Sequence, residues 1–255
     1  MIISCVKWGD KFSHVHVNRL YRMCQKNMQE DFTFTCYTED PTDIDSGINI
    51  IPLDESRDLE TWWWKLCMFE SKTNETNIFF DLDVVIQNDI THFKDYVEAG
   101  SLRMVKSYWK PHLDGVPQSA GQTDIKNRFD MNINSSVLIW TGDMTDIWNM
   151  FNEDPEYYMM KYKGIDSYLY FHHKDKLTFF PPGDIYSRLY GYDENNHWNT
   201  HEKPEPDELY FKEDFNVCIF NGWMRRMFER RDHPDHMKRY LLSDEGYDGF
   251  EHYWD

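Results

Sequence analysis

Short apolar segments and one helical pattern alternate at the start of the chain. Residues 1–7 are mostly apolar and end in Trp8-Gly9-Asp10, which predicts a strand followed by a turn. Residues 13–28 place apolar side chains three and four positions apart, which predicts a helix with one apolar face. Residues 32–37 are β-branched and aromatic and precede a polar turn at 38–41, which predicts a second strand.

The next segments continue this alternation. Residues 60–71 follow a polar loop at 54–58 and have the pattern of an amphipathic helix. Residues 78–86 read Ile-Phe-Phe-Asp-Leu-Asp-Val-Val-Ile, which predicts a strand interrupted only by two acids. Strands that alternate with helices favour an α/β fold with a mainly parallel sheet. Ligands of such sheets bind at the carboxyl ends of the strands, so we expect the functional site near these acids.

The second half of the chain is less regular but contains the same kinds of element. We expect strands at 136–140, 177–180 and 216–220, helices at 144–151, 165–173 and 234–242, and a surface loop at 191–208. The sequence has no internal repeat and no linker long enough to separate two folding units. It therefore predicts a single α/β domain over residues 1–255.

Asp81 and Asp83 are the first candidates for chemistry. Side chains alternate along a strand, so two residues that lie two apart share a face and their carboxylates point the same way. Neighbouring buried acids repel each other unless a cation neutralises them, and carboxylate oxygens suit Mg²⁺, Mn²⁺ or Ca²⁺ better than zinc. The pair therefore predicts a metal site at a strand end. The alternative is a strand that ends in a solvated acidic turn.

The charge balance limits the partners. The 255 residues carry a formal net charge of −18, which argues against nucleic acid and anionic membranes because both need a basic surface. No apolar run approaches the roughly 18 residues of a membrane-spanning helix, so we expect no integral membrane segment. An acidic protein can hold a diphosphate only with a metal ion and a few well-placed cations. Asp81 and Asp83 would bind this metal ion.

The cysteines indicate a compartment. They are odd in number, widely scattered and contain no Cys-x-x-Cys motif. This usage is typical of reduced thiols that fill a core, so we expect a cytoplasmic protein. The five residues are Cys5, Cys24, Cys36, Cys67 and Cys218.

Five segments between residues 1 and 225 stand in a recognisable order. They are Cys5-Val6-Lys7-Trp8-Gly9, Trp63-Trp64-Lys65-Leu66 through Phe69, Phe80-Asp81-Leu82-Asp83-Val84-Val85, Asn132 to Val137 and Gly164 to Leu169. This series resembles the GT-A-fold glycosyltransferases that use nucleotide sugars, in particular their glycogenin-like, family 8-like members. In that family the segments correspond to the nucleotide-binding first strand, the helix before the metal motif, the Asp-x-Asp motif, the donor-sugar segment and the Gly-Asp segment.

The resemblance implies a GT-A-type, Rossmann-like sandwich, in which a central, mainly parallel mixed sheet is flanked by helices. Residues 1–90 would form the nucleotide-binding half, residues 91–225 the donor-sugar and acceptor half, and residues 226–255 a C-terminal helix and tail. The implied activity is that of a hexosyltransferase-like enzyme. It would move a sugar from a nucleotide diphosphate sugar, of the UDP-sugar type, to a carbohydrate or glycoconjugate acceptor.

The resemblance also implies a donor site. Trp8 and Tyr37 end the first two strands, where a base and ribose would lie, and each could stack on the base or fill the core. Asn134 and Ser135 could bond sugar hydroxyls or cap a strand. The implied nucleotide- and donor-binding residues are Val6, Lys7, Trp8, Tyr37, Lys65, Asp81, Leu82, Asp83, Asn134 and Ser135.

The implied cofactor is Mn²⁺ or Mg²⁺, bound by Asp83, with Asp81 as a direct or water-mediated ligand. It would act as a Lewis acid that stabilises charge on the departing diphosphate. Many members add a histidine late in the chain, but the corresponding Ile219-Phe220-Asn221-Gly222-Trp223 has none. The carbonyl oxygen of Asn221 or a water molecule could take its place.

Asp166 and Lys65 are the candidate catalytic residues. Asp166 could be the general base for the acceptor hydroxyl in an inverting enzyme, hold donor hydroxyls in a retaining enzyme, or cap the helix at 165–173. Lys65 would face the phosphates or the sugar. The alternative is a solvated helix lysine.

Three other functions fit parts of the pattern. A haloacid-dehalogenase-type phosphatase also has an Asp-x-Asp motif after an apolar strand. It prefers Thr at the position of Val85 and places the motif near the start of the chain, and both differences argue against this function. A glycoside hydrolase needs a second carboxylate to work with Asp166, and the sequence pairs none with it. A transferase fold that only binds carbohydrate or nucleotide, with weak or no catalysis, remains the alternative because of the missing histidine and the altered Gly-Asp segment.

Overall fold

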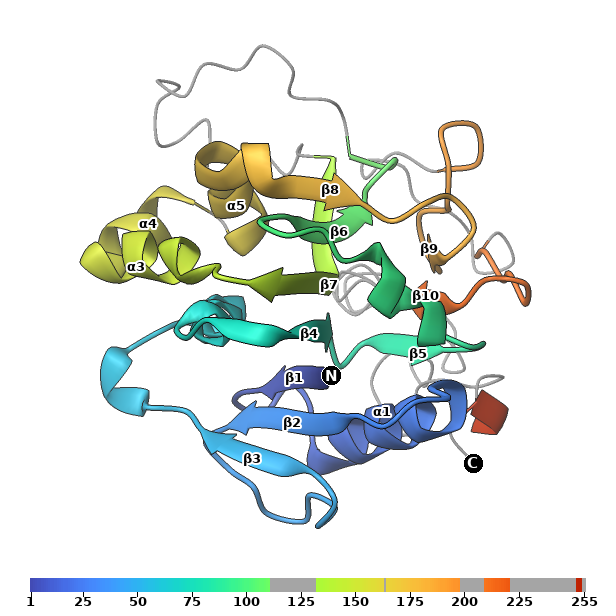
Figure 1. Ribbon diagram of the computed structural model, residues 1–255, viewed down its shortest axis with the longest axis horizontal. Helices are drawn as coiled ribbons and strands as arrows, with labels where there is room; N and C mark the ends of the chain where they lie inside the picture. Colours follow the sequence, from blue (N-terminus) through green and yellow to red (C-terminus); the bar gives the residue numbers. More distant parts are fainter. Residues whose placement is uncertain (111–131, 163, 198–208, 221–250, 254–255) are drawn as a thin grey trace, which may run out of the picture.

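The computed structural model describes residues 1–110, 132–162, 164–197, 209–220 and 251–253. Its centre is a mixed seven-stranded sheet with the strand order β3-β2-β1-β4-β7-β6-β8 (Figure 1). Four pairings in this sheet are parallel, and the two pairings of β7 are antiparallel. The strands are β1 (Ile2–Lys7), β2 (Thr33–Thr38), β3 (Asn49–Pro52), β4 (Thr73–Phe80), β6 (Leu102–Lys106), β7 (Ile133–Gly142) and β8 (Leu177–Phe179).

The structure also contains a small second sheet. It has the order β5-β10-β9, formed by β5 (Val84–Ile86), β10 (Val217–Ile219) and β9 (Ile185–Ser187). Its buried strands pack with helix α1 (His14–Asn27) and one face of the large sheet in a first core cluster. Val17, Leu20 and Cys24 lie on the apolar face of α1, as their spacing predicts.

The other face of the large sheet is covered by helices that are close together in the second half of the chain, and by one 3₁₀ helix. α3 (Thr145–Glu153) and α4 (Pro155–Lys161) lie at the left in Figure 1, next to α5 (Ile165–His173). The 3₁₀ helix η2 (Thr61–Phe69) packs with them in a second core cluster. Further 3₁₀ turns in the described residues are η1 (Glu55–Arg57), η3 (Thr91–Tyr96), η4 (Lys174–Lys176) and η6 (Glu251–Tyr253).

Many of the predicted elements are confirmed, and so is the α/β class with its mostly parallel central sheet flanked by helices. β1, α1, β2, α3, α5, β8 and β10 all fall where the pattern places them. The five cysteines are free and buried. Within the described segments, no helix is both long enough and apolar enough to cross a membrane.

Two local predictions are wrong. Residues 61–69 form a 3₁₀ helix that is buried all round from Trp63 onwards, because it lies between the sheet and the α3 and α5 helices. The two acids do not share the face of one strand, because β4 ends at Phe80 and β5 begins at Val84 in the other sheet. Asp81 and Asp83 lie in the turn that links the two sheets.

Candidate functional site

The carboxyl end of β4 meets the start of β7 in the middle of the large sheet. The Asp81 amide donates a hydrogen bond of 2.8 Å to the carbonyl oxygen of Ser136. β7 runs antiparallel to β4, with Val137 opposite Phe80. The first residues of β7, which include Asn134 and Ser135, therefore lie beside the acidic turn.

Lys65 connects these two segments from η2. Its Nζ lies 2.5 Å from Asp81 Oδ1 and donates a hydrogen bond of 3.5 Å to the carbonyl oxygen of Ser135. The Lys65 side chain is only 11% exposed, and a buried ammonium is stable only beside a partner such as this carboxylate. The alternative of a solvated helix lysine is therefore wrong.

The surroundings of Asp81 disfavour its charged form. Burial is the main cause of a raised pKa at Asp81; the Lys65 ammonium opposes the shift and the negative charge of Asp83 adds to it. A divalent cation beside both carboxylates would offset the burial and the repulsion together. Their oxygens are the hard ligands that Mn²⁺ or Mg²⁺ requires, so this donor set fits the predicted cofactor.

The carboxylates of Asp81 and Asp83 would need help from other ligands. No group of three or more His, Cys, Asp and Glu side chains is close enough to hold a metal ion in the described part of the chain. Asn221, the predicted third ligand, lies outside the described residues, as does the predicted helix at 234–242. Phosphate oxygens of a donor and water are the other oxygen ligands that such a site admits.

Asp166 lies in the first turn of α5 and contacts both β7 and the segment after β6. Its Oδ1 accepts a hydrogen bond of 3.1 Å from the Ser135 amide, and its Oδ2 lies 2.9 Å from Lys110 Nζ. Burial alone would raise the pKa of Asp166, but the Lys110 charge and the Ser135 hydrogen bond outweigh it and lower the pKa below its usual range. The N-cap residue of α5 is Gly164, so the interpretation of Asp166 as a helix cap is wrong.

Lys110 is a site residue that the sequence analysis missed. Its ammonium group contacts Asp166 and also donates a hydrogen bond of 2.6 Å to the carbonyl oxygen of Ile133. The two ends of the ion pair are 56 positions apart in the chain. No motif marks Lys110, and only the pairing of β6 with β7 brings it to Asp166.

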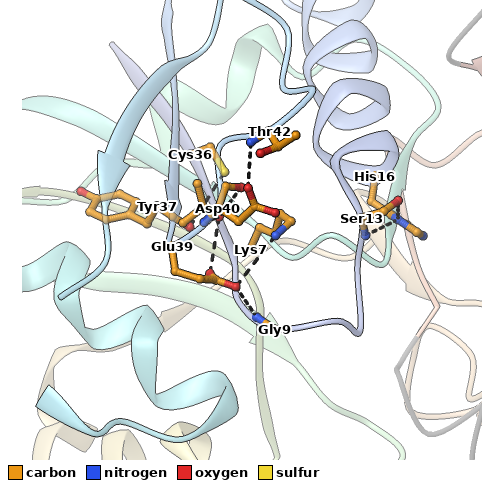
Figure 2. A network of polar contacts seen from close by, with 10 residues as sticks. Lys7, Gly9, Ser13, His16, Cys36, Tyr37, Glu39, Asp40 and Thr42 are labelled. Atoms are coloured by element: carbon orange, nitrogen blue, oxygen red, sulfur yellow. Dashed lines mark hydrogen bonds and ion pairs between the residues drawn. The ribbon is translucent and has the colours of Figure 1, made fainter. Parts of the chain in front are cut away.

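A second polar cluster lies at the carboxyl ends of β1 and β2 (Figure 2). Lys7 is buried, with Nζ 3.9 Å from Glu39 Oε1, and the Gly9 amide donates a hydrogen bond of 2.7 Å to the same carboxylate oxygen. Thr38 Oγ1 accepts a hydrogen bond of 3.1 Å from the Asp40 amide and so fixes the turn after β2. The two parallel strands thus end in one hydrogen-bonded network.

The predicted base-binding residues divide between the two faces of the sheet. Val6, Trp8 and Tyr37 pack against the second core cluster, and Figure 2 shows the Tyr37 ring turned away from Lys7. Burial raises the pKa of Tyr37 to about 12, so its hydroxyl stays neutral. Tyr37 is thus half-buried against the second core cluster, whereas Leu82 is buried in the first core cluster.

No protein-family model matches the sequence, and no curated protein matches it significantly. Solved structures are similar in fold. The galactosyltransferase LgtC in complex with donor and acceptor sugar analogues is 12% identical, over 95% of this chain and 97% of that chain, with a TM-score of 0.55. The chain has the fold of these glycosyltransferases.

Two further structures share this architecture. An active-site mutant of LgtC is 13% identical over 99% of this chain and 95% of that chain, with a TM-score of 0.58. The apo structure of the bifunctional glycosyltransferase WbbM is 11% identical over 88% of this chain and 47% of that chain, with a TM-score of 0.56. At these identities the similarity concerns the fold, so the activity has to be argued from the site.

Proposed function

We propose that this chain is a metal-dependent glycosyltransferase that moves a sugar from a nucleoside diphosphate sugar, a UDP-sugar, to a carbohydrate or glycoconjugate acceptor. The observation that carries the proposal is the position of Lys65. It links the acidic turn to the start of β7, where Ser135 also binds Asp166. The Lys65 ammonium, the carboxylates of Asp81 and Asp166 and the polar groups at the start of β7 thus converge at the edge of the sheet where β4 ends.

The chemistry requires stabilisation of a leaving group. The bond between the sugar C1 and the diphosphate oxygen breaks while a hydroxyl oxygen of the acceptor bonds to C1. The hydroxyl proton is released to water, and the diphosphate departs with an additional negative charge. Lys65 is the buried cation closest to the acidic turn and would contact this charge. Asp81 and Asp83 would hold Mn²⁺ or Mg²⁺, which supplies Lewis-acid stabilisation of the same diphosphate when bound.

The sugar end of the site would be formed by the Asp166 cluster. An ionised carboxylate with a lowered pKa accepts hydrogen bonds from sugar hydroxyls well and takes up a proton poorly. We therefore assign Asp166 to positioning the donor sugar rather than to general base catalysis. The Asn134 side-chain oxygen accepts a hydrogen bond of 3.0 Å from the Ser136 amide, which leaves its NH₂ group to donate to a hydroxyl.

The base and ribose would bind at the carboxyl ends of β1 and β2. Lys7 and the Glu39 network lie there, and Trp8 and Tyr37 are half-buried aromatic residues of the same edge. Both rings pack against the second core cluster and keep part of their surface exposed, so each is a candidate for stacking on the base. We propose UDP as the nucleotide because the sequence resembles GT-A-fold glycosyltransferases of the UDP-sugar type.

The proposal is tested by release of nucleoside diphosphate from UDP-glucose, UDP-galactose, UDP-N-acetylglucosamine and GDP-mannose in the presence of Mn²⁺. Slow release from a UDP-sugar, abolished by a chelator and by Asp83→Ala, is the expected result. Asp175→Asn is the matched control, because this exposed carboxylate lies beyond the opposite end of α5 from Asp166. Donor binding without release under any of these conditions would instead support the binding protein without turnover.

A further inference from the structure

One aromatic side chain of the buried helix η2 reaches the surface. Trp62 is 41% exposed, whereas Trp63 and Trp64, which follow it, are 2% and 1% exposed. An indole with two-fifths of its surface exposed to water contributes less to stability through burial than a fully buried indole does. An aromatic side chain in such a position at the edge of a polar site is typical of ligand contact.

The backbone of Gly164 gives this indole its place. A Cβ atom added to Gly164 would lie 2.6 Å from Trp62 Nε1 and 3.1 Å from Trp62 Cδ1. The Gly164 backbone is extended, with φ −179°, a conformation that any residue adopts. The local reason for glycine here is therefore the close approach of the Trp62 ring, which lies against the chain two residues before Asp166.

The geometry of η2 leads to the same position. A 3₁₀ helix has three residues per turn, so side chains three apart lie on one face. Trp62 therefore shares a face with Lys65, whose ammonium lies between Asp81 and Ser135. The close approach of the ring to Gly164 and the helical face that it shares with Lys65 both place the indole on the side of η2 that faces the proposed site.

We propose that Trp62 is a stacking platform for a sugar ring of the acceptor. This inference rests on the proposed transferase function and assigns an acceptor subsite beside the donor sugar. A pyranose buries its apolar C–H face on an indole while its hydroxyls remain solvated, so it matches a half-exposed aromatic ring. It is also uncharged, which suits a chain with a net charge of −18 better than an anionic ligand does.

Nuclear magnetic resonance of the ¹⁵N-labelled chain can test this subsite directly. The probes are the methyl glycosides of glucose, galactose, mannose and N-acetylglucosamine, each added in the presence of UDP and Mn²⁺. The Trp62 indole N–H signal is identified by its loss in Trp62→Phe. We expect at least one glycoside to shift this signal and its dissociation constant to rise at least tenfold in Trp62→Ala.

Two further variants separate stacking from a general effect on folding. Gly164→Ala keeps the indole but displaces it, because the added methyl group would occupy its place, so glycoside affinity should fall while the other indole signals stay dispersed. Tyr157→Ala removes another exposed aromatic side chain, 44% exposed on α4, and glycoside affinity should not change.

The possible failures are distinct. If UDP and Mn²⁺ shift other signals but no glycoside shifts that of Trp62, the acceptor subsite is refuted and the proposed function stands. If UDP alone shifts the Trp62 signal and the glycosides do not, the ring contacts the donor base and the inference is likewise wrong. If neither nucleotide nor donor binds, the proposed function itself fails.

Discussion

Lys65 and Asp81 form an ion pair with 2.5 Å between Nζ and Oδ1. Both side chains are largely buried, so neither charge is well solvated by water. The pair joins η2, which is surrounded by the second core cluster, to the turn between the two sheets. A residue proposed to contact a diphosphate is thus also part of the connection that fixes the acidic turn.

Replacement of Lys65 should therefore affect both stability and activity. Lys65→Met removes one partner of a buried pair, which is expected to cost about 3 kcal/mol in the free energy of unfolding. Loss of one charged group at a leaving group should also lower nucleoside diphosphate release roughly 100-fold. Urea unfolding and the release assay measure the two effects.

The matched control for this variant is Lys72→Met, which removes an exposed lysine shortly after η2. It should leave both quantities within the error of measurement. A Lys65→Met variant with full stability and full release would remove Lys65 from the site.

His173 predicts a pH dependence that is independent of the site. It is buried in α5, where burial lowers its pKa to about 4 despite Asp146, whose carboxylate lies 3.6 Å away. In the unfolded chain a histidine has a pKa of about 6.5, so between this pH and the folded pKa the unfolded state binds a proton that the folded state does not bind. Stability should therefore fall as the pH decreases from about 6.5 to about 4, by on the order of 3 kcal/mol.

The measurement is urea unfolding of the wild type and of His173→Gln at pH 7, 5.5 and 4. The stability difference between the two proteins should shrink or reverse as the pH falls, because Gln carries no proton in either state. His252→Gln, at an exposed histidine, is the control and should follow the wild type. Parallel pH curves for wild type and His173→Gln would contradict the prediction.

The sequence identifies the elements of this fold where apolar spacing alone decides them. The spacing in α1 and in α5 is that of a helix with a buried face, and both helices lie within a residue of their expected bounds. Residues 61–69 are different, because seven consecutive buried side chains have no periodicity to read. The tertiary environment, rather than the local pattern, determines that this segment is a 3₁₀ helix.

The site is predictable only in part for a related reason. Asp81, Asp83 and Lys65 stand out in the sequence because a charge in apolar surroundings is costly unless a partner of opposite charge or a bound ion neutralises it. Lys110 has no such context in the sequence, and its contact with Asp166 depends on the register of β6 and β7. Tyr37 and Leu82 remain predicted donor-binding residues; the Leu82 side chain is buried in the first core cluster and the Tyr37 side chain is half-buried against the second.

Asp166 should stabilise the folded state when the pH is above the pKa of its carboxyl group. Its folded pKa is lowered, mainly by the Lys110 charge and the Ser135 hydrogen bond acting against burial. The stabilisation is therefore present above the unfolded value of about 3.9 and is lost as the pH falls through the lower folded value. Asp166→Asn should cost roughly 2 kcal/mol at pH 7, the contribution of a hydrogen bond to a charged group, and less at pH 3.

A double-mutant cycle with Lys110→Met tests the cause of this stabilisation. If the ion pair is responsible, the two single losses at pH 7 should not add in Asp166→Asn/Lys110→Met. Urea unfolding at pH 7 and pH 3 provides all the required values. Additive losses, or an Asp166→Asn penalty that is the same at both pH values, would show that the pair contributes nothing.

Binding of nucleotide should depend on the acidic turn. A ligand at 100 times its dissociation constant stabilises the folded state by about 2.7 kcal/mol. For a chain of this size, that corresponds to a rise in melting temperature of roughly 5–10 °C. We expect UDP to produce this rise with Mn²⁺ and to lose it when a chelator is added. Asp83→Ala should abolish the rise, since it removes a carboxylate ligand, whereas Asp175→Asn should retain it. An equal rise with chelator present would show that UDP binds without a cation, and the acidic turn would then need another role.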